Sequence, residues 1–127
     1  MSILPLVDLP KSFHDARGSI QPLTESCQVI MSTEGAIRAN HYHRVGSHSC
    51  FVVAGALDYY HRPVGSDAPP ERVQVKMGQM FHTPPMVEHA MVFTAYTILV
   101  VIGEGRKTQD EYEADVVRLV RPLYTDA

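Results

Sequence analysis

The sequence predicts an all-β sandwich or barrel, and three observations lead to that class. Short runs of β-prone residues recur along the 127 residues, and turns rich in glycine and proline separate them. Glu71–Lys76 alternates polar residues with Val73 and Val75, which is the period of a half-buried strand. Thr97–Ile102 is almost wholly apolar, as expected of a core strand. We therefore expect many short strands around one core.

The first part of the chain should form an arm and then enter the sheet. Residues 1–14 contain Pro5 and Pro10 and are expected to form an arm or an edge strand. Asp15–Ile20 should turn into a strand, because Gly18 can adopt positive φ. The later strands are expected at Gln28–Ser32, Ile37–His43, Ser49–Ala54, Gly55–Arg62, Glu71–Lys76, Met80–Thr83, Glu88–Phe93 and Thr97–Ile102.

Two segments have the composition of loops, and the C-terminal part combines two kinds of element. Val64–Pro70 and Gly103–Asp110 are rich in polar and turn-forming residues, which predicts loops. The apolar residues of Gln109–Val120 fit neither the helical nor the strand period cleanly. We expect a short helical turn there, followed by a terminal strand.

Composition excludes several classes of protein. The formal net charge is −3 and lysine and arginine form no cluster, so we expect no nucleic-acid partner. No apolar run approaches the ~18 residues of a membrane-spanning helix. The N-terminus lacks the basic and apolar regions of a signal peptide, so we expect a cytoplasmic protein with Cys27 and Cys50 reduced.

Histidines are concentrated in one stretch of the chain. His41, His43 and His48 fall within eight residues, and His89 follows in a second stretch. His41 and His43 share a face if Ile37–His43 is a strand. We expect the next strand to lie beside it, antiparallel, so that His48 joins the same point. Neutral imidazole is the commonest metal ligand in proteins, although two alternating histidines alone also fit a polar strand surface.

The spacing of these residues resembles the two motifs of the cupin superfamily. Gly35 is followed by five residues, His41-Tyr42-His43, four residues, His48, six residues and Gly55, and every spacing fits the first motif. His48 replaces the usual glutamate. Gly78 is followed by five residues, Pro84-Pro85-Met86, two residues, His89, three residues and Phe93, with Met86 in place of the usual glycine and Phe93 in place of asparagine.

The resemblance implies a fold, a site and an assembly. It implies an RmlC-like cupin jelly roll, a double-stranded β-helix, over residues 1–127 as one domain. Its barrel core would be about 15–110, with the arm 1–14 and a C-terminal extension 111–127. It also implies that His41, His43, His48 and His89 hold one divalent transition metal per chain. Four nitrogen ligands favour Zn, Fe, Ni, Cu or Mn over Mg or Ca. Pairing of cupins through arms and edge strands implies a homodimer.

The resemblance leaves the reaction open. One possibility is an oxygenase, isomerase or decarboxylase that acts on a small polar substrate at the metal. Another is a sugar-nucleotide ketoisomerase or epimerase with His41 and His43 as acid–base residues, because Asp15-Ala16-Arg17-Gly18 and Arg38-Ala39-Asn40-His41-Tyr42-His43 are similar to segments of such enzymes, with Ala39 in place of glycine. A third is a cupin that binds a metal or a ligand without catalysis.

Three further residues bear on the site. His82 is either a catalytic acid or base lining the pocket or a surface histidine. Cys50 shares the parity of His48, so it should face inward, where a free cysteine is usually a core residue. Arg38 could bind a substrate phosphate or carboxylate. A regular strand would place it on the face opposite His41, which argues against that role.

Overall fold

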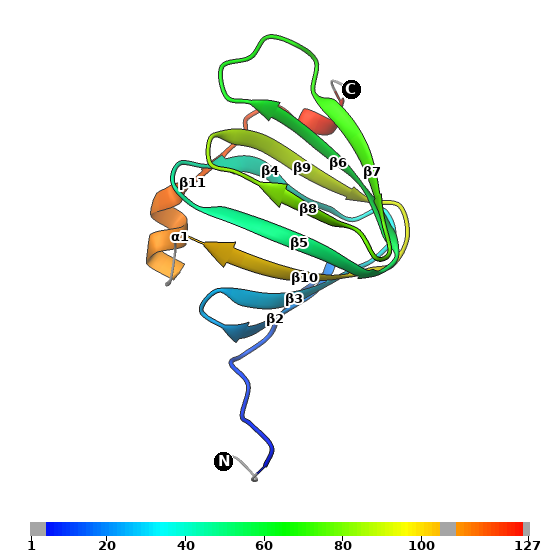
Figure 1. Ribbon diagram of the computed structural model, residues 1–127, viewed down its shortest axis with the longest axis vertical. Coiled ribbons are helices and arrows are strands. Elements are labelled where there is room, and N and C mark those ends of the chain that lie inside the picture. The colour runs from blue at the N-terminus through cyan, green and yellow to red at the C-terminus, as the bar shows by residue number, and fades with distance from the viewer. Residues whose placement is uncertain (1–4, 105–108, 126–127) are drawn as a thin grey trace.

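Two antiparallel β-sheets form the molecule, and the computed structural model describes residues 5–104 and 109–125 (Figure 1). The first sheet has the strand order β1-β2-β3-β10-β5-β8. Its strands are β1 Phe13–Asp15, β2 Gly18–Thr24, β3 Cys27–Ser32, β5 Ser47–Ala54, β8 Met80–Thr83 and β10 Thr97–Glu104. The second sheet has the order β11-β4-β9-β6-β7. Its strands are β4 Ile37–His43, β6 Ala56–Pro63, β7 Glu71–Lys76, β9 Val87–Phe93 and β11 Val116–Arg118.

The predicted all-β class and jelly-roll arrangement are confirmed, with one qualification about closure. Within the described ranges no strand pairing joins the two sheets, so they form an open sandwich instead of a closed barrel. The expected short helix is α1, Gln109–Asp115, which leads into β11 as predicted. A single 3₁₀ turn, Leu123–Thr125, follows. The predicted loop Gly103–Asp110 is shorter, because β10 runs to Glu104 and α1 begins at Gln109; residues 105–108 lie outside the described residues.

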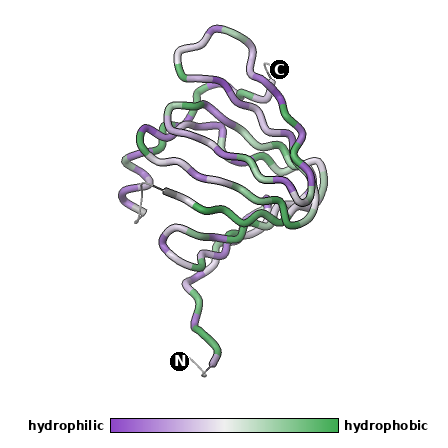
Figure 2. Tube along the Cα trace, viewed as in Figure 1, coloured by the Kyte–Doolittle hydropathy of each residue, from purple (hydrophilic) through white to green (hydrophobic). Residues whose placement is uncertain are grey.

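The core lies between the sheets and follows from the two-residue period of the strands. Leu57, Phe93, Leu99 and Val52 are each at most 1% exposed. Figure 2 shows the hydrophobic positions that run along β10, the strand predicted to be a core strand. Apolar burial of this kind contributes about 25 cal/mol per Å² of apolar surface removed from water. This core fixes the inner faces of the strands that carry the histidines.

The N-terminal segment extends away from the sandwich. Residues 5–12 form no strand, and Figure 1 shows them leaving the body before β1 pairs with β2. Gln21 holds the segment through a hydrogen bond from its side-chain amide to the carbonyl of Pro10, at 2.9 Å. The expected arm is therefore present up to β1. The described part of the chain has no helix with the length and apolar character needed to span a membrane.

Candidate metal centre

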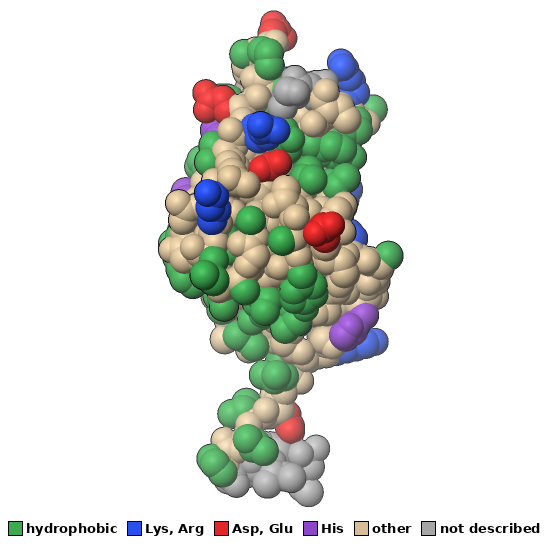
Figure 3. Space-filling model, turned by 90° about the vertical axis from the view of Figure 1, so that its right-hand side faces the viewer, with side chains coloured by type: hydrophobic (Ala, Val, Ile, Leu, Met, Phe, Trp, Pro, Cys, Tyr) green, Lys and Arg blue, Asp and Glu red, His purple; other side chains and the backbone are tan. Residues whose placement is uncertain are grey.

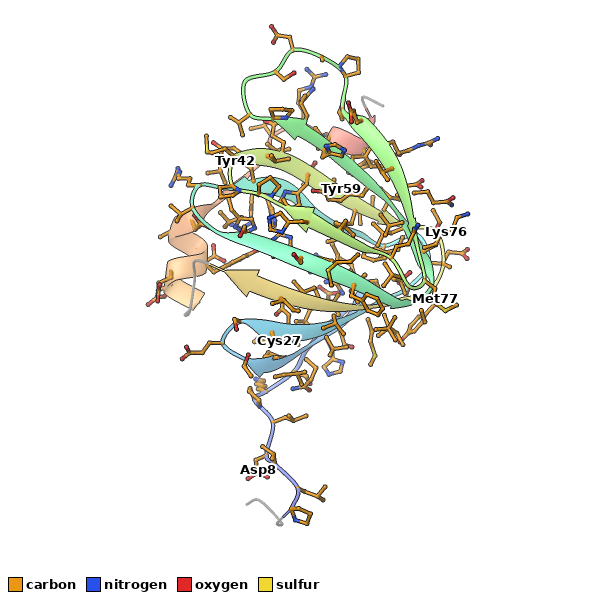
Figure 4. All side chains as sticks on the ribbon, viewed as in Figure 1. Asp8, Cys27, Tyr42, Tyr59, Lys76 and Met77 are labelled. Atoms are coloured by element: carbon orange, nitrogen blue, oxygen red, sulfur yellow. The ribbon has the colours of Figure 1, made fainter. Side chains whose placement is uncertain are left out.

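Three histidines meet between the sheets. His41 and His43 lie on β4, and His89 lies opposite His41 in the register of the neighbouring strand β9. The possible ligand atoms of these three residues all lie within 4.8 Å of one another. The ring centroids of His41 and His43, and of His41 and His89, are each 4.8 Å apart. Figure 4 shows side-chain nitrogen atoms gathered between the sheets at the end where Tyr42 lies.

His48 approaches this group from the other sheet. Its ring centroid lies 5.5 Å from that of His43 and 5.3 Å from that of His89, but His48 does not belong to the tight group of three. The prediction that Ile37–His43 and the next strand pair as adjacent antiparallel strands is wrong. β4 pairs with β9 and β11, whereas β5 pairs with β10 and β8. The turn at Val45–Gly46 thus crosses from one sheet to the other, so the histidines converge across the core.

Hydrogen bonding fixes the ring of His89 in one tautomer. Its Nδ1 lies 3.0 Å from the carbonyl oxygen of Val87, an acceptor, so Nδ1 carries the hydrogen and Nε2 carries a lone pair. Within the described residues this Nε2 is buried and has no hydrogen-bond partner. A buried polar atom without a partner costs free energy, about 1–3 kcal/mol. A metal ion between the rings would supply the missing partner, so the residues present fit such an ion.

Asp115 orients His43, and the sequence analysis did not identify it. Asp115 is 8% exposed, and its carboxylate accepts a hydrogen bond from Nδ1 of His43 at 3.1 Å. It also accepts backbone N–H bonds from Val45 at 2.6 Å and Gly46 at 3.0 Å. A carboxylate behind a histidine fixes the tautomer and raises the basicity of the other ring nitrogen, as it does for metal-ligating histidines. Asp115 therefore ties α1, the crossing turn and the histidine cluster together.

The environment keeps two of the clustered imidazoles, His41 and His89, neutral. Burial, followed by the nearby histidines, lowers the pKa of His41 to about 2. Burial also lowers the pKa of His89 to about 4. Desolvation would raise the pKa of Asp115, but the backbone N–H bonds from Val45 and Gly46, together with His43, hold it below its usual range. A neutral imidazole is the form that binds a metal ion, so His41 and His89 are in the protonation state that metal binding requires.

These pKa values predict a loss of stability on mild acidification. The unfolded chain takes up protons on His41 and His89 near the ordinary pKa of ~6.5, whereas the folded chain does not, so stability falls with pH below that value. In the presence of a chelator, the free energy of unfolding in urea should drop by on the order of 3 kcal/mol between pH 7 and pH 5 from these two residues.

His41→Gln should remove about half of that drop, and His14→Gln, at an exposed site, should leave it unchanged. An equal drop in His41→Gln and in the parent protein would contradict this reading of the site.

A β-bulge alters the parity of β4. Ala39 and Asn40 have φ values of 69° and 61°, and the pairing with β9 shifts between Ala39 and His41. Arg38 therefore lines the same cavity as His41, and Arg38 is only 6% exposed. The prediction that Arg38 faces away from His41 is wrong, because it assumed a regular strand.

Two residues with left-handed backbone stand where the resembled sequences have glycine, Met86 in the second cupin motif and Ala39 in the segment similar to sugar-nucleotide enzymes. Ala39 and Met86, at φ 69° and 62°, occupy those positions. The left-handed region costs a non-glycine residue about 1–2 kcal/mol. Replacing that residue with glycine removes this cost, but glycine loses more conformational entropy on folding, which offsets about 0.5–1 kcal/mol of the gain. Ala39→Gly and Met86→Gly should each raise the free energy of unfolding by about 0.5–1 kcal/mol. Ala54→Gly, in β5, should lower the free energy of unfolding. A change of the same sign in all three variants would contradict the backbone strain assigned to Ala39 and Met86.

The histidines open onto a cavity of about 350 Å³. Cys50 faces it as predicted; burial raises the pKa of this thiol to about 12, which keeps it protonated. Neither Cys27 nor Cys50 forms a disulfide.

Tyr112 of α1 also lines the cavity, with its ring centroid 5.6 Å from that of His43. His82 is exposed and its Nδ1 lies 2.9 Å from the hydroxyl of Ser49, and it is not among the residues that line the cavity.

Comparison with solved structures identifies the class of fold. The chain superposes on CapF, a capsular polysaccharide assembling protein from Staphylococcus aureus, with a TM-score of 0.75 at 22% identity, over 89% of this chain and 33% of CapF. It superposes on the sugar 3,4-ketoisomerase QdtA from Thermoanaerobacterium thermosaccharolyticum, solved with TDP, with a TM-score of 0.61 at 14% identity, over 88% and 85% of the two chains. The protein therefore has an RmlC-like cupin fold, as the motifs predicted.

The similarity is one of fold and not of close sequence. No protein-family model matches the sequence, and no curated protein does. The chain spans about one third of the length of CapF, so it corresponds to one part of that protein. The same fold occurs in the CENP-C domain of Drosophila melanogaster, at a TM-score of 0.58 and 12% identity, over 68% of this chain and 64% of that one. Function must therefore be argued from the site.

Proposed function

We propose that the protein is a mononuclear metal-binding cupin, and an enzyme acting on a small polar substrate. One observation supports metal binding above all. The Nε2 of His89 is buried near His41 and His43 and has no hydrogen-bond partner among the described residues. Three imidazoles leave positions on a divalent ion open to substrate, as in catalytic sites. His48 is the fourth ligand in this proposal. Zn, Fe, Ni, Cu and Mn all suit such nitrogen donors.

The reaction types that fit are those of an oxygenase, an isomerase or a decarboxylase. When bound, the metal would supply Lewis-acid chemistry to an oxygen of the substrate. The chain's own residues hold the donors in place: Val87 and Asp115 fix the ring nitrogens of His89 and His43. Met91 and Val101 add apolar wall to the cavity.

Elemental mass spectrometry tests the metal proposal directly. The protein should be purified without a histidine tag and measured as isolated and after incubation with each candidate metal. We expect about one transition-metal ion per chain. No bound metal in any of these samples would contradict the proposal.

A second candidate function rests on the fold neighbours. QdtA is a sugar 3,4-ketoisomerase solved with TDP, and this chain matches most of its length. In that function, His41 and His43 act as acid–base residues on a nucleotide-linked keto sugar without a metal. A histidine whose pKa burial lowers to about 2 is a weak base at neutral pH, which favours the metal reading for His41.

Hydrogen exchange separates these two functions. The chelator-treated protein should be incubated in D₂O with TDP-4-keto-6-deoxyglucose, the sugar nucleotide bound in a further QdtA structure. The metal proposal predicts no deuterium next to the keto group beyond the rate of the His41→Gln variant. Exchange that depends on His41 and His43 in the absence of metal would instead support the ketoisomerase.

Self-association is part of the proposal. Leu6, Val7 and Leu9 of the N-terminal segment and Phe13 at the start of β1 are 56–78% exposed, which suits burial against a second copy. Figure 3 shows hydrophobic side chains on that segment and on the adjoining end of the sandwich. Sedimentation velocity should give the mass of a homodimer, and that of a single chain if this is wrong. The expected cytoplasmic location and the absence of a nucleic-acid partner stay predictions.

A further inference from the structure

The cavity at the histidines is strongly biased in charge. Its described lining contains three arginines and no aspartate or glutamate. Arg17 is paired with Asp15 at 2.6 Å, and Arg118 is paired with Glu113 at 3.1 Å. Arg38 has no carboxylate within ion-pair distance among the residues that the structure describes. A cavity of this kind attracts anions, and a divalent metal would strengthen that preference.

Arg38 is buried in an orientation that leaves part of its guanidinium available. Its Nε donates to the hydroxyl of Ser32 at 2.8 Å, and its Nη2 donates to the carbonyl of Met31 at 3.2 Å. Within residues 5–104 and 109–125, Nη1 has no hydrogen-bond partner. Two fixed bonds on the Nε side hold the fork rigid, so the edge between Nη1 and Nη2 can receive a planar anion with two parallel hydrogen bonds.

The bulge places this arginine beside the histidines. Arg38 pairs with Met91 in the strand register, and His41 pairs with His89, with only the bulge residues between them. Arg38, His41 and His89 all line the same cavity. One molecule can therefore contact the guanidinium and the histidine cluster at the same time. Burial, reinforced by Arg17, lowers the pKa of Arg38, so an anionic ligand would offset the cost of burying its charge.

We propose that the cavity binds a small carboxylic acid as its anion, with the carboxylate on Arg38 and a second oxygen toward the histidine cluster. The inference rests on the metal-binding function proposed above and names its substrate class. The volume of about 350 Å³ is near the lower end of the ~300–1,000 Å³ found for ligand sites. Ile20, Ile30 and Val101 form apolar walls that suit a short carbon chain. The single open edge of Arg38 matches a carboxylate better than a larger polyanion.

Nuclear magnetic resonance titration of the zinc-loaded, ¹⁵N-labelled protein tests this inference. The probes are pyruvate, its uncharged analogue methyl pyruvate, and inorganic phosphate. The Nε–H of Arg38, which is hydrogen-bonded to Ser32, serves as a local reporter. We expect pyruvate to shift this signal and to bind at least tenfold more tightly than methyl pyruvate or phosphate.

Two variants and a control assign the effect to Arg38. Arg38→Met keeps the length of the side chain without its charge and should weaken pyruvate binding at least tenfold. Arg38→Lys keeps the charge without the fork and should recover only part of the affinity. Arg72→Met, at an exposed position of β7, should bind pyruvate as the parent does. If Arg38→Met does not fold, the affinity of Arg38→Lys for pyruvate and the affinity of the parent protein for methyl pyruvate test the inference instead.

The zinc content, measured on the same samples, separates this inference from the metal proposal. Loss of pyruvate binding in Arg38→Met with about one zinc per chain retained would support the carboxylate subsite. Unchanged pyruvate binding in Arg38→Met, equal binding of methyl pyruvate, or preferential binding of phosphate would overturn it. Binding of pyruvate that depends on Arg38 in a chain that holds no zinc would contradict the metal proposal and leave the subsite standing.

Discussion

His89→Gln should reduce the bound metal from about one ion per chain to less than a tenth of that, and His41→Gln should do the same. Both residues belong to the tight group of three imidazoles, and the Nε2 of His89 has no other partner among the described residues. Loss of one of three ligands removes the geometry on which the ion depends. Elemental mass spectrometry on dialysed protein, with unfolding measured in parallel, provides the readout.

His48 supplies the matched comparison. Because it lies outside the tight group, His48→Gln should weaken metal binding less than His89→Gln. His48→Glu should restore most of the binding, because cupin motifs usually have glutamate at this position and carboxylate oxygen is also a metal ligand. Full metal retention in His89→Gln would contradict the assignment of the centre. Equal losses of bound metal in His48→Gln and His89→Gln would show that the four histidines contribute equally to metal binding.

Asp115→Asn should lower the affinity for metal by about 10- to 100-fold, which is the usual effect of removing a carboxylate behind a ligating histidine. The carboxylate of Asp115 receives the Nδ1–H of His43 and two backbone N–H groups of the crossing turn. Asp115→Ala should in addition lower the free energy of unfolding by about 3 kcal/mol or more, since buried donors lose their acceptor. Metal competition with a chromophoric chelator and urea unfolding measure the two effects.

Glu113→Gln is the control for this prediction, since Glu113 lies on the same helix and is paired with Arg118 at the surface. It should change neither the metal affinity nor the stability by more than about 0.5 kcal/mol, as exposed ion pairs contribute little. Metal affinity in Asp115→Asn equal to that of Glu113→Gln would show that the carboxylate does not act on the centre.

The strands of the fold could be predicted from local sequence. Glu71–Lys76, Ile37–His43 and Met80–Thr83 have the bounds that were expected, because turn residues mark their ends and their side chains alternate. The same alternation placed His41 and His43 on one face of their strand. These features depend only on neighbours along the chain.

The features that complete the candidate site depend on distant parts of the chain. The bulge at Ala39 and Asn40 could not be inferred, because alanine has no preference for positive φ. Asp115 lies 72 residues from His43, and no local pattern links them. The turn at Val45–Gly46 fits a hairpin as well as a crossing between sheets; the crossing is held by Asp115, which lies far along the chain.

Crystals grown with zinc or cobalt and measured at the absorption edge of the metal test the central claim most directly. We expect one anomalous peak between the sheets, about 2.0–2.1 Å from the Nε2 atoms of His43 and His89 and from a ring nitrogen of His41. A metal-soaked crystal with no peak among these three rings, or with its peak at surface residues such as His82, would contradict the assignment of this cluster as a metal centre.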